Sequence, residues 1–258
     1  MNDIDCRLCG AAARPSFTHE FLGKYPVQYF ICSDCGSLET EPPYWLDESY
    51  IDVINDEDTG YLSRNVDTAR DTHFLLEIMQ VPRSATILDF GGGLGINARL
   101  LREQGRNAFC FDAYTVPIFA DVRWSGNAKP DLVLAFEVFE HLPNPAEDLV
   151  QIFQWLPDFV YVRTCRYFGQ SPDWTYLAPS HGQHVFFYTD AAMEKLARRF
   201  GYSVILPTDT DAIFSREPIP PLQRRALGAA LSGQHIRRRI FSRMSRLLAA
   251  PTQSPKPG

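Results

Sequence analysis

The sequence lacks the marks of an exported or membrane-spanning protein. No stretch approaches the ~20 consecutive apolar residues of a membrane span, and the acidic start, MNDIDCRLCG, has neither the positively charged nor the apolar part of a signal peptide. Hydrophobic residues make up 45% and charged residues 22% of the 258 positions, which argues against disorder and fibrous folds. Internal repeats are absent as well. We therefore expect a cytoplasmic globular protein with one main domain.

An excess of positive charge is also missing, so we expect no nucleic-acid partner. The net charge is −6, but nine Lys/Arg and one acid lie from Arg216 onward, which leaves −14 for residues 1–215. Residues 217–258 mix arginine with Leu, Ile, Phe and Met at near-helical spacing, which predicts a basic helical tail. The sequence leaves open whether this tail is simply solvated, docks on the acidic body, binds a protein partner or lies on a membrane surface.

Cysteine is scarce, and four of the six cysteines form two Cys-x2-Cys pairs, Cys6/Cys9 and Cys32/Cys35. Two such pairs about twenty residues apart are typical of a single tetrahedral Zn²⁺ site. Four thiolate ligands leave no position for water or substrate, so this zinc is expected to be structural. Residues 1–42 are therefore predicted to form a zinc ribbon, which is too small to fold on a hydrophobic core alone.

The rest of the chain alternates between strand and helix patterns. Residues 43–83 form a helical lead-in, and residues 84–216 form an α/β domain. This alternation predicts a mostly parallel sheet covered on both faces, with an antiparallel C-terminal hairpin. The expected strands are 85–90, 107–112, 131–137 and 159–164, the expected hairpin is 203–207 with 212–216, and helices are expected over 68–79, 94–104, 144–156 and 190–202.

A glycine-rich turn follows the first of these strands. Asp89 precedes Gly91, Gly93 and Gly95, and Asp112 ends the next strand about twenty residues later, where an acid can bind ribose hydroxyls. Such a turn lets a ligand approach the backbone closely. Asp89 would repel a pyrophosphate but not an ammonium group.

Two motifs, ILDFGGGLG and PDLVLAFEVFEHLPNP, resemble those of the class I S-adenosylmethionine-dependent methyltransferases. The resemblance covers roughly residues 60–215 and implies a Rossmann-like sheet. It also implies that Asp89 and the three glycines line the amino-acid part of S-adenosylmethionine, and that Asp112 binds its ribose. The further cofactor contacts that it implies are Asp121 at the adenine, Glu137 after the third expected strand, and Tyr61 and Arg64 over the cofactor carboxylate.

Methyl transfer to a hydroxyl requires removal of a proton, and histidine is the usual base near neutral pH. The candidates, in order of preference, are His184, His141 and His181, which follow strands at the edge where α/β sheets bind substrates. His141 can instead hold its loop by hydrogen bonds, and His184 can be a packed core histidine.

Two further resemblances bear on the substrate. The ribbon joined to such a domain is similar to the N-terminal part of deoxysugar C-methyltransferases, whose further C-terminal lobe is missing here. We therefore expect a small sugar-containing acceptor methylated at a hydroxyl, with N- or C-methylation or a scaffold without turnover as alternatives. Glu137, Glu140 and His141, with His184 downstream, resemble the metal-ligand set of small-RNA 2′-O-methyltransferases, so a catalytic divalent ion is a further alternative.

The zinc ribbon can be tested by metal analysis. The purified protein should hold about one zinc per chain, and Cys32→Ser should lower this content because it removes one of four thiolate ligands. Undiminished zinc in Cys32→Ser would contradict the assignment.

Overall fold

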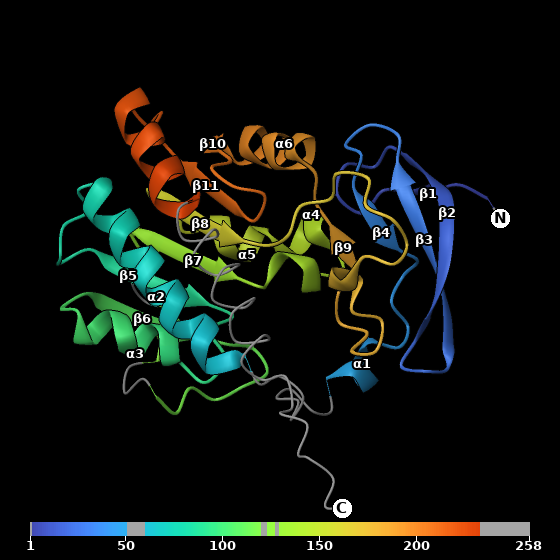
Figure 1. Cartoon of the computed structure of the whole chain (residues 1–258), viewed down its shortest axis with the longest axis horizontal. Helices are drawn as coiled ribbons and strands as arrows, with labels where there is room; N and C mark the ends of the chain where they lie inside the picture. Colours follow the sequence, from blue (N-terminus) through green and yellow to red (C-terminus); the bar gives the residue numbers. More distant parts are fainter. Residues whose placement is uncertain (1, 51–59, 120–122, 127–128, 233–258) are drawn as a thin grey trace, which may run out of the picture.

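The computed structural model describes residues 2–50, 60–119, 123–126 and 129–232, which form two sheets side by side (Figure 1). The smaller sheet is antiparallel, with the order β1-β2-β3-β4-β9. Four of its strands come from the N-terminal forty residues, and the fifth comes from far along the chain. Their bounds are β1 Ile4–Asp5, β2 Ala12–Phe21, β3 Tyr25–Cys32, β4 Leu38–Thr40 and β9 Phe186–Phe187.

The larger sheet has the order β10-β11-β8-β7-β5-β6. Its four strands β6, β5, β7 and β8 are parallel, and β11 and β10 continue the sheet as an antiparallel hairpin. The expected mostly parallel sheet with its C-terminal hairpin is thus confirmed. The bounds are β5 Thr86–Phe90, β6 Asn107–Phe111, β7 Leu132–Phe136, β8 Phe159–Arg163, β10 Ser203–Ile205 and β11 Asp211–Ser215.

Helices cover both faces of the larger sheet. Alternate strand residues point to opposite sides, so that Ile87 joins the core under α2 and α3 while Leu88 joins the core under α4, α5 and α6. The second core continues into the small sheet, where it includes Cys6 and Cys35. The helices are α1 Leu46–Ser49, α2 Tyr61–Ile78, α3 Ile96–Glu103, α4 Pro145–Asp148, α5 Val150–Phe153 and α6 Asp190–Phe200.

Two expected helices differ in detail from the structure. The helix expected over 68–79 already begins at Tyr61, as α2. The helix expected over 144–156 is divided into α4 and α5 at Leu149. Near this residue some backbone amides donate to the carbonyl three residues earlier, as in a 3₁₀ helix, and the Ile152 amide donates to the Leu149 carbonyl in this way. The stretch 112–130 adds no full strand among the described residues, only an isolated bridge between Cys110 and Arg123. Among the described residues, no helix or full strand therefore lies between β6 and β7.

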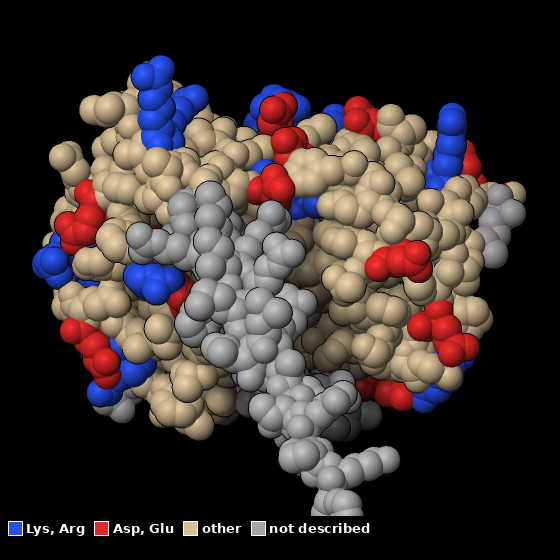
Figure 2. Space-filling model, viewed as in Figure 1, with Lys and Arg blue, Asp and Glu red and all other residues tan. Residues whose placement is uncertain are grey.

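The start of the predicted basic tail is helical over residues 221–232. Leu227 and Leu231 are buried and join the core that α2 and α3 cover. This part of the tail packs on the body, while residues 233–258 lie outside the described residues. Among the helices that the structure describes, none has the length and apolarity to cross a membrane. Basic and acidic side chains are interspersed on the face shown in Figure 2.

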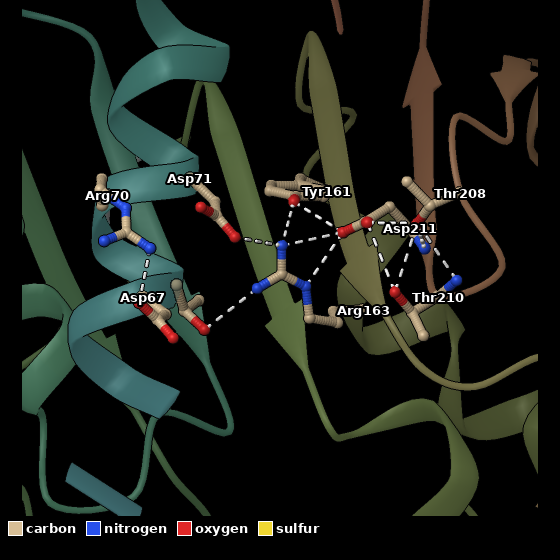
Figure 3. A network of polar contacts seen from close by, with 9 residues as sticks. Asp67, Arg70, Asp71, Tyr161, Arg163, Thr208, Thr210 and Asp211 are labelled. Carbon is tan, nitrogen blue, oxygen red and sulfur yellow. Dashed lines mark hydrogen bonds and ion pairs between the residues drawn. The ribbon is translucent and has the colours of Figure 1, made fainter. Parts of the chain in front are cut away.

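A buried ion network ties α2 to the carboxyl-terminal edge of the sheet (Figure 3). Arg163 at the end of β8 donates to Asp71 of α2 at 3.0 Å and to Asp211 of β11 at 3.0 Å. Tyr161 also donates to Asp211, and Thr68 accepts from Arg163. One cation thus neutralises two carboxylates that come from different elements.

We predict that Arg163→Met lowers the free energy of unfolding by about 3–5 kcal/mol, because two buried carboxylates lose their cation. Adding Asp71→Asn should restore part of the stability in urea unfolding. A loss that is unchanged by Asp71→Asn would contradict this account.

Candidate functional site

The glycine turn lies between β5 and α3 and is closely packed on both sides. Gly91 has φ +70°, and a Cβ there would stand 2.6 Å from Cγ2 of Val138. Gly93 has φ +55°, and a Cβ there would stand 2.8 Å from the Tyr61 hydroxyl. Tyr61 begins α2, and its hydroxyl accepts from the Leu94 amide at 3.4 Å. The turn therefore depends on residues without side chains, and Tyr61 lies directly over it.

The two acids beside the turn have different surroundings. Asp89 is 2% exposed beneath the turn, next to Asn97 and the Ala98 amide of α3, and burial raises its pKa to about 7. Asp112 follows β6, and its carboxylate accepts from the Gly93 amide at 2.9 Å. Asp89 Oδ2 lies beside Gly92 and has no hydrogen-bond partner among the described residues, whereas Asp112 binds the turn through the Gly93 amide.

The remaining residues predicted to contact the cofactor near this turn are Gly95, Arg64 and Asp121. Gly95 has φ +83° and forms the N-terminal cap of α3. Arg64 lies on the exposed face of α2, one turn beyond Tyr61. Asp121 lies outside the described residues.

A group of one carboxylate and two imidazoles lies beyond the end of β7. Each of Glu140, His141 and His184 offers a ligand atom, and these atoms lie within 4.8 Å of one another. We call this group the Glu–His centre. Glu140 and His141 belong to a short 3₁₀ turn, Phe139–His141, whereas His184 immediately precedes the segment that enters β9. Residues more than forty positions apart thus form one centre.

The protonation states of the two imidazoles follow from their contacts. His184 Nδ1 lies 2.6 Å from the Tyr176 carbonyl oxygen, which can only accept, so Nδ1 carries the proton and Nε2 remains an acceptor. His141 Nδ1 lies 3.3 Å from the Tyr50 hydroxyl. Burial lowers the pKa of both rings, and for His141 the neighbouring His184 lowers it further. Both rings are therefore neutral at neutral pH and able to accept a proton or bind a cation.

Tyr176 joins the two carboxylates of this region. Its hydroxyl contacts Glu140 Oε1 and lies 3.0 Å from Glu137 Oε2. Glu140 is fully buried, and its Oε2 has no hydrogen-bond partner within the described part of the chain. Glu137 keeps an exposed edge, but the protein atoms around its carboxylate and the Glu140 charge raise its pKa to about 8.

His181 is not part of this centre. Its backbone amide donates to the Ala178 carbonyl, and its side chain lies outside the group formed by Glu140, His141 and His184. Sequence reasoning did not find the roles of Tyr176 and Tyr50, which contact Glu140 and His141 respectively. Neither tyrosine stands in a motif, so no sequence signal marks these roles.

The four N-terminal cysteines lie together as their spacing predicts. Their sulfur atoms all lie within 4.8 Å of one another, with Cys6 and Cys35 at 3.8 Å and Cys9 and Cys32 at 3.5 Å. The amide of Cys35 also donates to the Cys32 sulfur. This arrangement of four sulfurs and backbone amides fits a closed metal site.

Taken together, the sheet order and the glycine turn define a Rossmann-like α/β domain of the class I methyltransferase type. A family profile described as a methyltransferase domain matches residues 62–206, more than half of the chain, and the protein belongs to this family. The resemblance to class I S-adenosylmethionine-dependent methyltransferases is thereby confirmed. No sequence among the curated proteins matches.

Several solved methyltransferase structures are similar to this chain at low identity. The 1,6-didemethyltoxoflavin-N1-methyltransferase of Burkholderia thailandensis, with bound S-adenosylhomocysteine, is 17% identical with a TM-score of 0.46 over 78% of this chain and 97% of that one. The magnesium protoporphyrin IX methyltransferase of Synechocystis PCC 6803 is 15% identical with a TM-score of 0.41 over 67% and 95%. CalO1, a methyltransferase of calicheamicin biosynthesis, is 16% identical with a TM-score of 0.42 over 66% of this chain, which spans 60% of CalO1.

The close packing of the glycine turn yields a prediction for cofactor binding. Gly91→Ala should lower the affinity for S-adenosylmethionine about tenfold or more, because the new methyl group meets Val138 and must displace the turn. Isothermal titration would measure this loss.

Gly23→Ala is a matched control, since Gly23 has φ +68° but no atom within 4 Å of a Cβ. Both variants should lose about 1–2 kcal/mol of stability from the left-handed backbone. Gly23→Ala changes only the turn between β2 and β3 and should bind the cofactor like the wild type, so equal affinity in the two variants would contradict the role given to Gly91.

Proposed function

We propose that the protein transfers a methyl group from S-adenosylmethionine to a hydroxyl of a small acceptor that contains a sugar. The glycine turn, Asp112 and Tyr61 would hold the cofactor, since they combine close backbone approach with a carboxylate for ribose hydroxyls. Asp89 would line the amino-acid part of the cofactor together with the glycines, as the resemblance implies. Methylation of a nitrogen or carbon atom, or a scaffold without turnover, remains an alternative to be tested with the same protein.

The observation that carries the choice of a hydroxyl is the Glu–His centre. Methyl transfer from a sulfonium is an in-line displacement, so a hydroxyl acceptor must lose its proton as its oxygen attacks. His184 offers a free Nε2 acceptor whose orientation is set by the bond from Nδ1 to the Tyr176 carbonyl. An oriented neutral imidazole is the arrangement that a general base requires. His184 is therefore the preferred base and His141 the second candidate.

A second candidate mechanism uses a divalent cation at the same centre. Glu140, His141 and His184 place three ligand atoms within 4.8 Å, and the buried Glu140 Oε2 lacks a hydrogen-bond partner among the described residues. Carboxylate and imidazole ligands suit ions such as Mg²⁺ or Mn²⁺. Such an ion, when bound, would make an acceptor hydroxyl more acidic, and these residues would then serve as ligands rather than as bases.

The ribbon and the tail complete the proposal. The four cysteines would hold a structural Zn²⁺, since four sulfur ligands close the coordination sphere. A cytoplasmic location, and a protein or membrane partner for the tail, stay proposals that rest on composition alone.

The decisive experiment follows turnover of S-adenosylmethionine on a panel of sugar-containing acceptors, with products identified by mass spectrometry. His184→Ala should lower kcat by about tenfold or more while the affinity for S-adenosylmethionine is kept, because the ring acts on the acceptor rather than on the cofactor. Wild-type turnover in His184→Ala would remove this residue from the mechanism.

Metal dependence separates the two mechanisms in the same assay. If a histidine is the base, brief EDTA treatment should leave activity unchanged. If an ion is used, activity should be lost and then restored by Mg²⁺ or Mn²⁺. The zinc content of each sample is measured as the control, so that loss of the ribbon metal is not mistaken for loss of a catalytic ion. Products methylated only at nitrogen or carbon would overturn the hydroxyl assignment.

A further inference from the structure

The first cysteine pair of the ribbon carries an arginine that reaches across to the methyltransferase domain. Arg7 lies between Cys6 and Cys9, and its side chain is 10% exposed. Its Nε donates to the buried Glu39 carboxylate of β4 at 2.8 Å. This ion pair fixes the Nε end of the guanidinium, and the short loop between Cys6 and Cys9 fixes the backbone of Arg7. The remaining N–H groups reach the backbone carbonyls of Pro143 and Val185, and also that of Thr40 in β4.

These remaining groups hold both segments from which the Glu–His centre is built. One Arg7 nitrogen donates to the Pro143 carbonyl at 2.8 Å, two residues after His141. The other donates to the Val185 carbonyl at 2.8 Å, one residue after His184, and also to the Thr40 carbonyl at 2.9 Å. The Arg7 guanidinium thus connects the segment that carries His141 to the segment that carries His184.

Backbone contacts reinforce this connection. The Val185 amide donates to the Glu140 carbonyl at 2.8 Å, and its carbonyl accepts from the Thr40 amide at 3.1 Å. The Ala146 amide donates to the backbone carbonyl of Arg7 at 3.3 Å. Beyond Val185, β9 pairs with β4 of the ribbon. The segment that carries His184 is therefore held by Glu140 on one side and by the ribbon on the other.

We propose that Arg7 is a positioning residue for the Glu–His centre, through which the ribbon sets the separation of His141 and His184. A planar guanidinium with five N–H groups can bind a carboxylate and two separate carbonyl groups at once. An ammonium group offers its donors from a single atom and cannot span Glu39, Pro143 and Val185 together. The inference concerns the same centre as the proposed function, but it does not depend on the identity of the acceptor.

The test compares zinc-loaded wild-type protein with Arg7→Lys, which keeps the charge beside Glu39. Hydrogen exchange of the backbone should rise about tenfold for the amides of residues 140–146 and 183–188, whereas β5 and β7 stay protected. Arg14→Lys is the matched control, because Arg14 is an exposed arginine of the same ribbon, and it should exchange like the wild type. Zinc content should be equal in all three proteins.

Two outcomes of the exchange measurement would overturn the proposal. One is unchanged protection of both segments in Arg7→Lys, and the other is an equal loss of protection throughout both sheets, which would indicate a general role in stability. The measurement needs no acceptor, so it decides the inference even where the proposed reaction fails. With an active acceptor, Arg7→Lys should lower kcat by about tenfold with the affinity for S-adenosylmethionine unchanged. An equal loss of both would also contradict positioning.

Discussion

The backbone of Val185 is the point on which the arrangement of the site depends. Its amide binds the Glu140 carbonyl, and its carbonyl receives donors from Thr40 and Arg7. The residue before it is His184, and the two residues after it form β9. One short segment therefore belongs at once to the centre of the methyltransferase domain and to the edge of the ribbon sheet. The ribbon is part of the construction of the site rather than a separate appendage.

The molecule contains two buried groups of ionisable side chains, the Arg163 network and the Glu–His centre. The Arg163 network neutralises its two carboxylates and fixes α2, whose first residue, Tyr61, covers the glycine turn. In the Glu–His centre, Glu140 is buried with one oxygen that has no hydrogen-bond partner among the described residues. Buried polar groups without partners are costly and are retained where a ligand or substrate completes them.

Much of this architecture could be predicted because its signals are local. The alternation that predicts β5 to β8, the glycine turn after Asp89 and the paired cysteines all depend on residues a few positions apart. What could not be predicted depends on distant residues meeting in space. Tyr176 contacts Glu140 across 36 positions and Arg7 contacts Val185 across 178, and no spacing rule links such pairs. The break of the helix expected over 144–156 comes from local tightening at Leu149, which the apolar pattern does not reveal.

The continuous core between the ribbon and the larger sheet has a consequence for how this protein can change over time. Cys6 and Cys35 share one apolar cluster with Leu88 and Val160 of the central strands. Modules joined by a linker can be exchanged between proteins by recombination, because each keeps its own interior. Here an α/β domain moved to another protein would keep β9 without its partner strand β4. A ribbon moved alone would lack β9, the fifth strand of its sheet. The two parts are therefore constrained to be inherited together.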